Sequence, residues 1–173
     1  MKDAIKANFD ASPTAYDEYE RMTGRFSALA SQLYDEMADR ADGPFDRILD
    51  AGAGTGISSR VFDARGSSPV ALDLSRSMLD INPVSARVQG DFDRLPFGAD
   101  RFDAVAFTAS LFLTPEPGRA AREARRVLRP GGSVGAVAPL GWTTADGEDV
   151  FRPLARESRS PASADAVEDA LRN

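Results

Sequence analysis

Three glycines at alternate positions, just after an acid, are the residues in this sequence whose types and spacing say most about chemistry. Gly52, Gly54 and Gly56 follow Asp50, which ends a short apolar run. This order predicts a strand, a tight turn and the start of a helix. Because glycine has no side chain, a ligand can lie directly against the backbone of such a turn.

The spacing of these glycines separates two classes of ligand. The dinucleotide fingerprint is G-x-G-x-x-G, but here the third glycine comes one residue early and Ile57 stands at the last position. Asp50 would repel a pyrophosphate, because both are anions, and would attract an ammonium group. The loop therefore favours a cofactor with an ammonium group over NAD. A tight turn without a ligand and another kind of nucleotide site are the alternatives.

Two more acids are candidates for a site. Asp73 ends the short apolar run that begins at Pro69, and Asp91 follows Gly90 in the segment Val88–Phe97. In open α/β sheets ligands bind outside the carboxyl ends of the strands, where an acid can accept hydrogen bonds from ribose hydroxyls. The alternatives are a helix N-cap for Asp73 and a polar loop between strands for Asp91.

The elements that must position these acids can be read from the periodicity of apolar residues. Residues 13–41 have helical periodicity, and Gly43-Pro44 ends that segment. From there strands and helices alternate, which predicts an α/β fold with a parallel, doubly wound sheet. Residues 102–107 form a buried strand in this scheme. An arginine-rich helix then stops at Pro130-Gly131-Gly132, and a strand follows from Ser133 to Pro139.

Five of these features, in order over roughly residues 45–139, resemble the class I S-adenosylmethionine-dependent methyltransferases. The matching segments are D-A-G-A-G-T-G from Asp50; the acid Asp73 with S-R-S-M-L from Ser75; G-D-F-D-R-L-P-F from Gly90; the strand F-D-A-V-A-F from Phe102; and R-V-L-R-P-G-G from Arg126. The resemblance is greatest to the branch that includes the ubiquinone and menaquinone biosynthesis methyltransferases. It implies a Rossmann-like fold and methyl transfer from S-adenosylmethionine to a small-molecule acceptor, with S-adenosylhomocysteine as the product.

The resemblance also implies a set of cofactor-binding residues. Asp50 would orient the methionine end, directly through its ammonium group or through water; Asp73 would hold the ribose and Asp91 the adenine. The full set is Asp50, Gly52, Ala53, Gly54, Asp73, Leu74, Asp91, Phe92, Thr108 and Tyr16. For Tyr16, which would cover the methionine end as part of a lid, the alternative is ordinary packing of an amphipathic helix. No catalytic residue is assigned; Tyr16, Asp17, Tyr19 and Ser110 are candidates for a base by expected proximity only.

The expected organisation is one structural domain. Residues 1–43 form an N-terminal helical lid segment, and residues 44–173 form the cofactor-binding Rossmann-like domain. The family's sheet continues with two more strands that have no counterpart here, and a last helix is expected after Ser160-Pro161. The fifth strand would then be an exposed edge, which favours pairing. A fragment of a longer protein, or a partner chain such as a second copy in a homodimer, would explain this.

Composition excludes several functions. The net charge of -6 gives no general basic field for nucleic acid. The absence of histidine and cysteine removes the commonest metal ligand, disulfides and thiol chemistry, so we expect no metal site. No apolar run is long enough to span a bilayer, so we expect a cytoplasmic protein without a membrane segment. Five arginines between Arg119 and Arg129 form either an anionic-ligand surface or, in the simpler interpretation, a solvated helix face.

Two other classes of function remain as alternatives. The chain could be a catalytically silent S-adenosylmethionine-binding domain with a regulatory or scaffolding role, which cofactor binding without turnover would reveal. It could also be a nicotinamide-dependent oxidoreductase, although the glycine spacing argues against that class.

Overall fold

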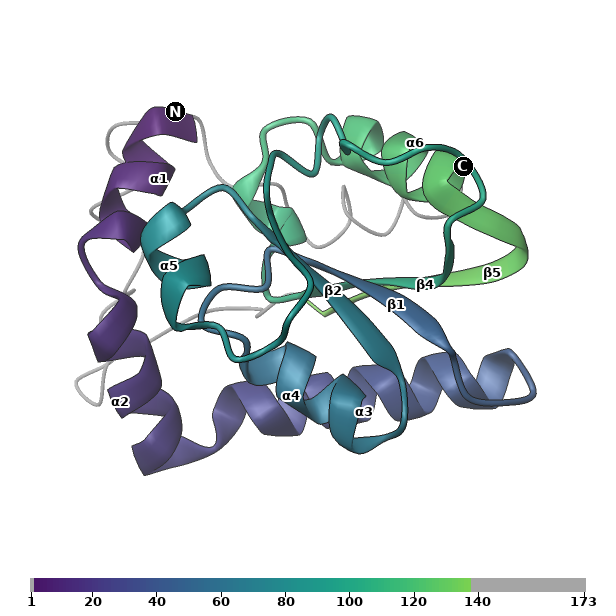
Figure 1. Cartoon of the computed structure of the whole chain (residues 1–173), viewed down its shortest axis with the longest axis horizontal. Helices are drawn as coiled ribbons and strands as arrows, with labels where there is room; N and C mark the ends of the chain where they lie inside the picture. The colour runs from purple at the N-terminus through teal and green to yellow at the C-terminus, as the bar shows by residue number, and fades with distance from the viewer. Residues whose placement is uncertain (1, 138–173) are drawn as a thin grey trace.

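The computed structural model of the chain describes residues 2–137 (Figure 1). The helices are α1 (Lys2–Asp10), α2 (Pro13–Thr23), α3 (Arg25–Arg40), α4 (Ile57–Ala64), α5 (Arg76–Ile81) and α6 (Pro117–Val127), with a short 3₁₀ turn η1 (Leu111–Leu113). The strands are β1 (Arg47–Ala51), β2 (Ser68–Asp73), β3 (Arg87–Gln89), β4 (Phe102–Thr108) and β5 (Leu128–Val137). Within this range no helix is long and apolar enough to cross a membrane.

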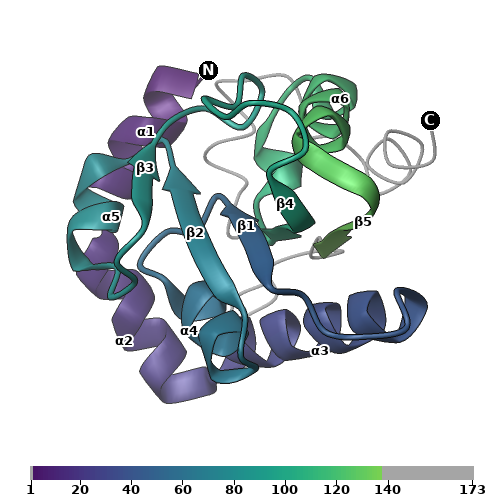
Figure 2. The ribbon, with the colours of Figure 1, turned by 45° about the vertical axis from the view of Figure 1, so that its right-hand side comes forward.

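The strands form one parallel sheet in the order β3-β2-β1-β4-β5 (Figure 2). At its centre, Leu49 of β1 lies opposite Val70 of β2 on one side and Val105 of β4 on the other. The strand order reverses at β1, because β2 and β4 lie on its two sides. This confirms the predicted α/β fold with a doubly wound parallel sheet. The two further strands of the family and the last helix concern residues 138–173, which lie outside the described part.

Alternate side chains of the central strands enter two separate apolar clusters. Ile48 of β1 packs with α3 and α4, whereas Leu49 packs with α6 on the opposite face. Figure 1 shows the same layering, with α3 and α4 on one side of the sheet and α6 on the other. Because side chains alternate along a strand, Asp50 falls on the α4 side, directly after the apolar residues that anchor β1.

The N-terminal helices differ from the single helical segment expected over residues 13–41. Gly24 adopts a left-handed conformation (φ 61°) and separates α2 from α3. The Glu20 carboxylate accepts hydrogen bonds from the first amides of α3, at Phe26 and Ser27, and so stabilises this break. A periodicity of three and four residues continues through both helices, which is why it did not predict the break.

After this break α3 packs on the sheet, while α1 and α2 lie beside α5 at its edge (Figures 1 and 2). At Gly135 of β5 an added Cβ would lie 2.4 Å from Met37 Sδ of α3. Helix α3 is therefore a covering layer of the sheet. Of the segment 1–43 expected to form a lid, α1 and α2 are the parts that lie near the strand ends. The boundary at residue 43 stays a prediction.

Candidate functional site

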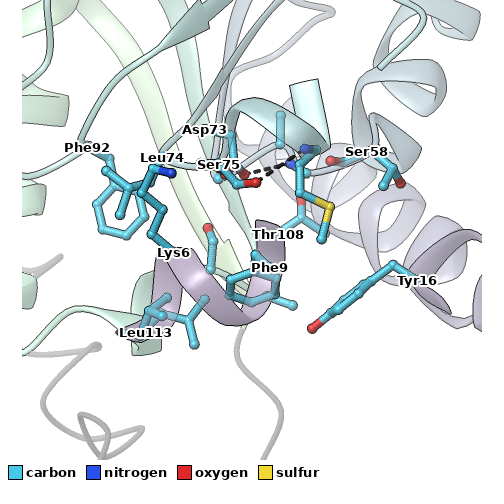
Figure 3. A pocket seen from close by; sticks show the side chains of 18 of the residues that line it. Lys6, Phe9, Tyr16, Ser58, Asp73, Leu74, Ser75, Phe92, Thr108 and Leu113 are labelled. Atoms are coloured by element: carbon cyan, nitrogen blue, oxygen red, sulfur yellow. Dashed lines mark hydrogen bonds between the residues drawn. The ribbon is translucent and has the colours of Figure 1, made fainter. Parts of the chain in front are cut away.

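A cavity lies at the carboxyl ends of β1, β2 and β4, between the sheet and helices α1 and α2. Figure 3 shows Phe9 and Tyr16 from the helices facing Asp73 and Thr108 from the strand ends. The cavity is lined by Lys2, Ile5, Lys6, Phe9, Tyr16, Phe26, Gly52, Ala53, Gly54, Thr55, Ile57, Ser58, Asp73, Leu74, Ser75, Met78, Gly90, Asp91, Phe92, Thr108, Ala109, Ser110, Phe112 and Leu113. All the residues expected to bind a cofactor are among them except Asp50.

The three glycines of the loop after β1 have different roles. All have positive φ, but an added Cβ at Gly52 would lie 2.4 Å from Ser110 Cβ, and one at Gly56 would lie 2.5 Å from Asn82 Oδ1. At Gly54, which lines the cavity, an added Cβ would meet no heavy atom within 4 Å. Gly52 and Gly56 are therefore needed for packing, whereas Gly54 leaves its backbone open to the cavity.

Asp50 lies beneath the glycine loop rather than on the cavity wall. The hydroxyls of Ser58 and Ser59 both donate to its Oδ2 at 2.6 Å, while its buried Oδ1 has no hydrogen-bond partner within residues 2–137. Burial raises the pKa of this carboxyl to about 6, although the two serine hydroxyls oppose the shift. Ser58 also lines the cavity, so one residue connects Asp50 to the wall.

Asp73 at the end of β2 holds the glycine loop against the strand. The Gly54 amide donates to its Oδ2 and the Ser75 amide to its Oδ1, each at 2.8 Å. Each carboxylate oxygen keeps a lone pair for a further donor. Helix α5 is capped by Ser75, whose hydroxyl accepts from the Met78 amide, so Asp73 is not the N-cap. Burial raises the pKa of Asp73, against the effect of these amides.

Asp91 is paired with a lysine from the other end of the chain. Lys2 Nζ lies 2.7 and 2.5 Å from the two Asp91 oxygens and 2.5 Å from Asp93 Oδ2. The neighbouring Phe92 lines the cavity, and its ring meets the Phe107 ring edge-on at a centroid distance of 5.6 Å. The loop after β3 therefore offers the cavity one carboxylate and one aromatic ring.

Aromatic side chains from α1, α2 and α3 close the opposite wall. The Tyr16 ring lies 5.4 Å from that of Phe9 and 5.8 Å from that of Phe26, centroid to centroid. Burial and the negative charge of Asp73 raise the pKa of Tyr16 to about 12. Tyr16 is thus a neutral phenol that faces the strand ends (Figure 3). Across from it, the buried hydroxyl of Thr108 has no hydrogen-bond partner in the part of the chain that the structure describes.

Of the four candidates for a general base, Tyr16 and Ser110 line the cavity, and Tyr16 is a neutral phenol whose pKa burial raises to about 12. Asp17 and Tyr19 do not line the cavity. Ser110 donates its hydroxyl to the Ala51 carbonyl at 2.5 Å. The acids that do line the cavity are Asp73 and Asp91. No catalytic residue is assigned.

Sequence reasoning missed several residues of the site. Lys2, Lys6 and Ile5 bring the first helix to the cavity, and Asp93 binds Lys2. A composition signal was available for the lysines, because the chain has only these two and both line the cavity. Ala109 also lines it, with a left-handed backbone (φ 53°) that is strained for alanine.

Comparison with known proteins places these features in one family. A family described as "Methyltransferase domain" matches residues 49–135. The demethylmenaquinone methyltransferase of Clavibacter sepedonicus is 38% identical over 142 residues, which are 75% of this chain and 56% of that protein. The one from Mycobacterium tuberculosis H37Rv is 32% identical over 169 residues, 92% of this chain and 70% of that protein. The chain therefore spans between about half and just over two thirds of these relatives.

Two solved structures also have a fold similar to that of this chain. The [4+2]-cyclase SpnF is 26% identical, with a TM-score of 0.61 over 82% of this chain and 56% of that chain. Streptomyces venezuelae DesVI is 25% identical, with a TM-score of 0.60 over 76% of this chain and 57% of that chain.

Proposed function

The chain belongs to the methyltransferase domain family, and from this premise we propose that it binds S-adenosylmethionine in the cavity and transfers the methyl group to a small aromatic acceptor. The observation that carries the proposal is the series of acids at the carboxyl ends of three neighbouring strands. Asp91 comes after β3, Asp73 ends β2, and Asp50 lies near the end of β1. The first two line the cavity, and Asp50 is connected to its wall through Ser58. This order suits the adenine, the ribose and the methionine end of one extended ligand.

The residues present fit that cofactor. Gly54 leaves open space where a ligand can lie against the backbone. Asp73 keeps acceptor capacity for two hydroxyls. Buried polar groups normally have partners, and among the described residues the Asp50 Oδ1 and Thr108 Oγ1 atoms have none. An ammonium group, acting through water or through Ser58, would supply the positive charge that the buried Asp50 carboxylate lacks as a partner.

The chemistry needs little from the protein. S-adenosylmethionine supplies a methyl group that its sulfonium already activates. Phe9, Tyr16 and Phe26 form an apolar wall that excludes water from the strand ends, and the wall fixes the direction from which an acceptor can approach. A chain without histidine or cysteine can catalyse such a transfer when the acceptor ionises without a strong base.

The acceptor class is carried over from the relatives. The Clavibacter and Mycobacterium proteins are named for demethylmenaquinone. Phe26, Phe112 and Leu113 give the cavity an apolar side that would suit an aromatic ring. We therefore propose demethylmenaquinone, or a ring compound like it, as the acceptor of this chain.

Calorimetric titration tests cofactor binding first. We expect S-adenosylmethionine and S-adenosylhomocysteine to bind and NAD not to bind. Incubation with labelled S-adenosylmethionine and demethylmenaquinone chemically reduced to its quinol, whose hydroxyls can ionise, then tests turnover, with label expected in the quinol and quinone fraction. Because the similar SpnF is a cyclase, the fold alone does not determine the reaction. Binding without transfer to any offered acceptor would favour the regulatory or scaffolding alternative, and NAD binding would overturn the cofactor assignment.

A further inference from the structure

Helix α1 crosses the cavity and is held mainly at its two ends. At one end Lys2 contacts the loop after β3. At the other, the Asp10 carboxylate accepts a hydrogen bond from the Ser75 hydroxyl at 2.5 Å. None of its residues is fully buried, and only half-buried side chains such as Ile5 and Phe9 face the cavity between these ends. A helix with so few buried apolar contacts opens at low cost, so its end contacts decide when it stays closed.

The contact at Lys2 joins one cation to two acids. An ammonium group has three donors, and the three oxygens within 2.7 Å of Lys2 Nζ belong to Asp91 and Asp93. Burial of Lys2 lowers its pKa, but the two carboxylates outweigh this and raise it, so the group stays charged. Asp93 is the more buried acid, 3% exposed, and its Oδ2 also accepts from the Thr114 hydroxyl at 2.7 Å.

Lys2 stands where a ligand amino group would have to approach Asp91. Its Nζ lies within hydrogen-bond distance of both Asp91 oxygens at once, which places it directly in front of the carboxylate. An exocyclic amino group that uses Asp91 as acceptor needs part of the same space. Asp93 offers Lys2 a second position, because its contact with Lys2 does not depend on Asp91.

We propose that Lys2 is a gate residue that competes with the adenine amino group for Asp91 and retains Asp93 as its partner when the cofactor binds. The proposal rests on the proposed function, in which Asp91 faces the adenine. Lys2 then lowers the affinity for cofactor and speeds its release, because each binding event must break the Lys2–Asp91 pair. Since α1 carries Lys2, the same exchange couples the position of this helix to occupancy of the adenine end.

The test uses Lys2→Met, which removes the charge of Lys2 and keeps an unbranched side chain. Arg94→Met is the matched control, because it removes an equal charge from the loop that carries Asp91 and Asp93, the partners of Lys2. The Arg94 residue is exposed, and only its backbone amide bonds to Asp91, at the carbonyl oxygen. Calorimetry with S-adenosylhomocysteine at low salt should show Lys2→Met binding about three- to tenfold more tightly than the unmodified chain. The difference should shrink at high salt, because screening weakens the pair. Arg94→Met should bind like the unmodified chain.

Hydrogen exchange of the protein without ligand gives an independent readout. Lys2→Met should speed amide exchange in α1, since one of its two end contacts is lost, and Arg94→Met should leave it unchanged. Equal or weaker binding by Lys2→Met, or unchanged exchange in α1, would overturn the gate while leaving the proposed function intact. A lack of binding by all three proteins would instead overturn the proposed function, so the two failures are distinguishable.

Discussion

At the scale of single residues, the Asp50 carboxyl is buried with only one of its two oxygens hydrogen-bonded within the described part of the chain. One of its oxygens accepts two hydroxyl hydrogen bonds, and the other is buried without a partner. Burial of a charge without a partner costs free energy, and the raised pKa of about 6 expresses that cost. Such a cost persists where a ligand offsets it, which is the pattern expected of a binding residue.

The raised pKa of Asp50 predicts how the free energy of unfolding depends on pH. The folded pKa of Asp50 lies above its unfolded value of 3.8. Between these two values the folded state retains a proton that the unfolded state has lost, so stability falls as pH rises from about 4 to about 6. Asp50→Asn should remove about 2–3 kcal/mol of this fall. Urea unfolding of the ligand-free protein between pH 4 and pH 7 measures it. Part of the fall should remain in the variant, because burial also raises the pKa of Asp73.

The same substitution should weaken cofactor binding. An asparagine at this position would lack the negative charge that attracts the ammonium group, so we expect Asp50→Asn to bind S-adenosylhomocysteine roughly 10- to 100-fold less tightly at pH 7. In the unmodified chain the affinity should fall below pH 6, as Asp50 takes up a proton. Calorimetry at pH 5 and pH 7 measures both effects. Equal affinity of the variant and the unmodified chain at pH 7 would remove Asp50 from the site.

Residues of the site differ in how far the sequence alone could predict them. Asp73 ends a short apolar run, and in a parallel sheet ligands bind at such ends, so local pattern was sufficient. Asp91 follows the polar strand β3, and only the resemblance of its segment to the family motif indicated it. Lys2 is 89 residues from Asp91 in the chain. Nothing local connects these two residues, and only the packing of α1 across the strand ends brings them together. The role of Gly52 in admitting Ser110 is of the same long-range kind.

At the scale of elements, the loop after β1 combines a left-handed backbone with an open wall. Gly54 has φ 52° and open space at its Cβ position, on the cavity side. Gly66 at the end of α4 has φ 85° and the same open space, but it does not line the cavity. A substitution at Gly66 therefore tests only the cost of a left-handed backbone, whereas one at Gly54 also tests the loss of space for a ligand.

Alanine at these two positions should affect stability alike and binding differently. Each substitution should destabilise the fold by about 1–2 kcal/mol, because alanine resists the left-handed region. Only Gly54→Ala should abolish binding of S-adenosylhomocysteine, since its methyl group enters the space against the backbone. Thermal unfolding and calorimetry on both variants provide the comparison. Retained binding in Gly54→Ala would mean that the cofactor does not approach the loop there.

Helix α3 and strand β5 form a second close approach between elements. Gly135 faces Met37 and Leu33, whose side chains fill the place of its Cβ. Gly135→Ala should destabilise the protein by about 1–3 kcal/mol through overpacking. In a Met37→Ala background the two shortest contacts are gone and only Leu33 Cδ1, at 2.9 Å, remains to shift, so the further cost should be smaller. A double-mutant cycle by urea unfolding measures this coupling, and additive costs would argue against the contact.

The elements also show where periodicity is insufficient. It predicts the helices over residues 13–41 but not the break at Gly24, because both helices keep their apolar side chains in one register. It predicts a strand after Pro130-Gly131-Gly132, whereas β5 already begins at Leu128 and pairs with Phe102 before a register shift. In both cases contacts from another element decide the boundary.

At the scale of the whole molecule, the cavity joins parts of the chain that would otherwise be separate layers. Its walls come from the ends of β1, β2 and β4 and from helices α1 and α2, so a ligand that fills it contacts both the sheet and the N-terminal helices. The fold class could be predicted from the alternation of strands and helices, because that alternation depends on local pattern alone. The placement of α1 over the strand ends could not, since it depends on contacts across the whole chain.

A ligand that contacts both layers should stabilise the entire unit. Binding to the folded state alone adds RT ln(1 + [L]/Kd), about 2.7 kcal/mol at a hundredfold excess over Kd. At about 2–4 °C for each kcal/mol in a chain of this size, that corresponds to a rise in Tm of about 5–10 °C. S-adenosylhomocysteine should give this rise in the unmodified chain and none in Gly54→Ala, and NAD should give none in either. A rise that persists in Gly54→Ala would place the ligand elsewhere on the molecule, because only a site away from the glycine loop would tolerate the added methyl group.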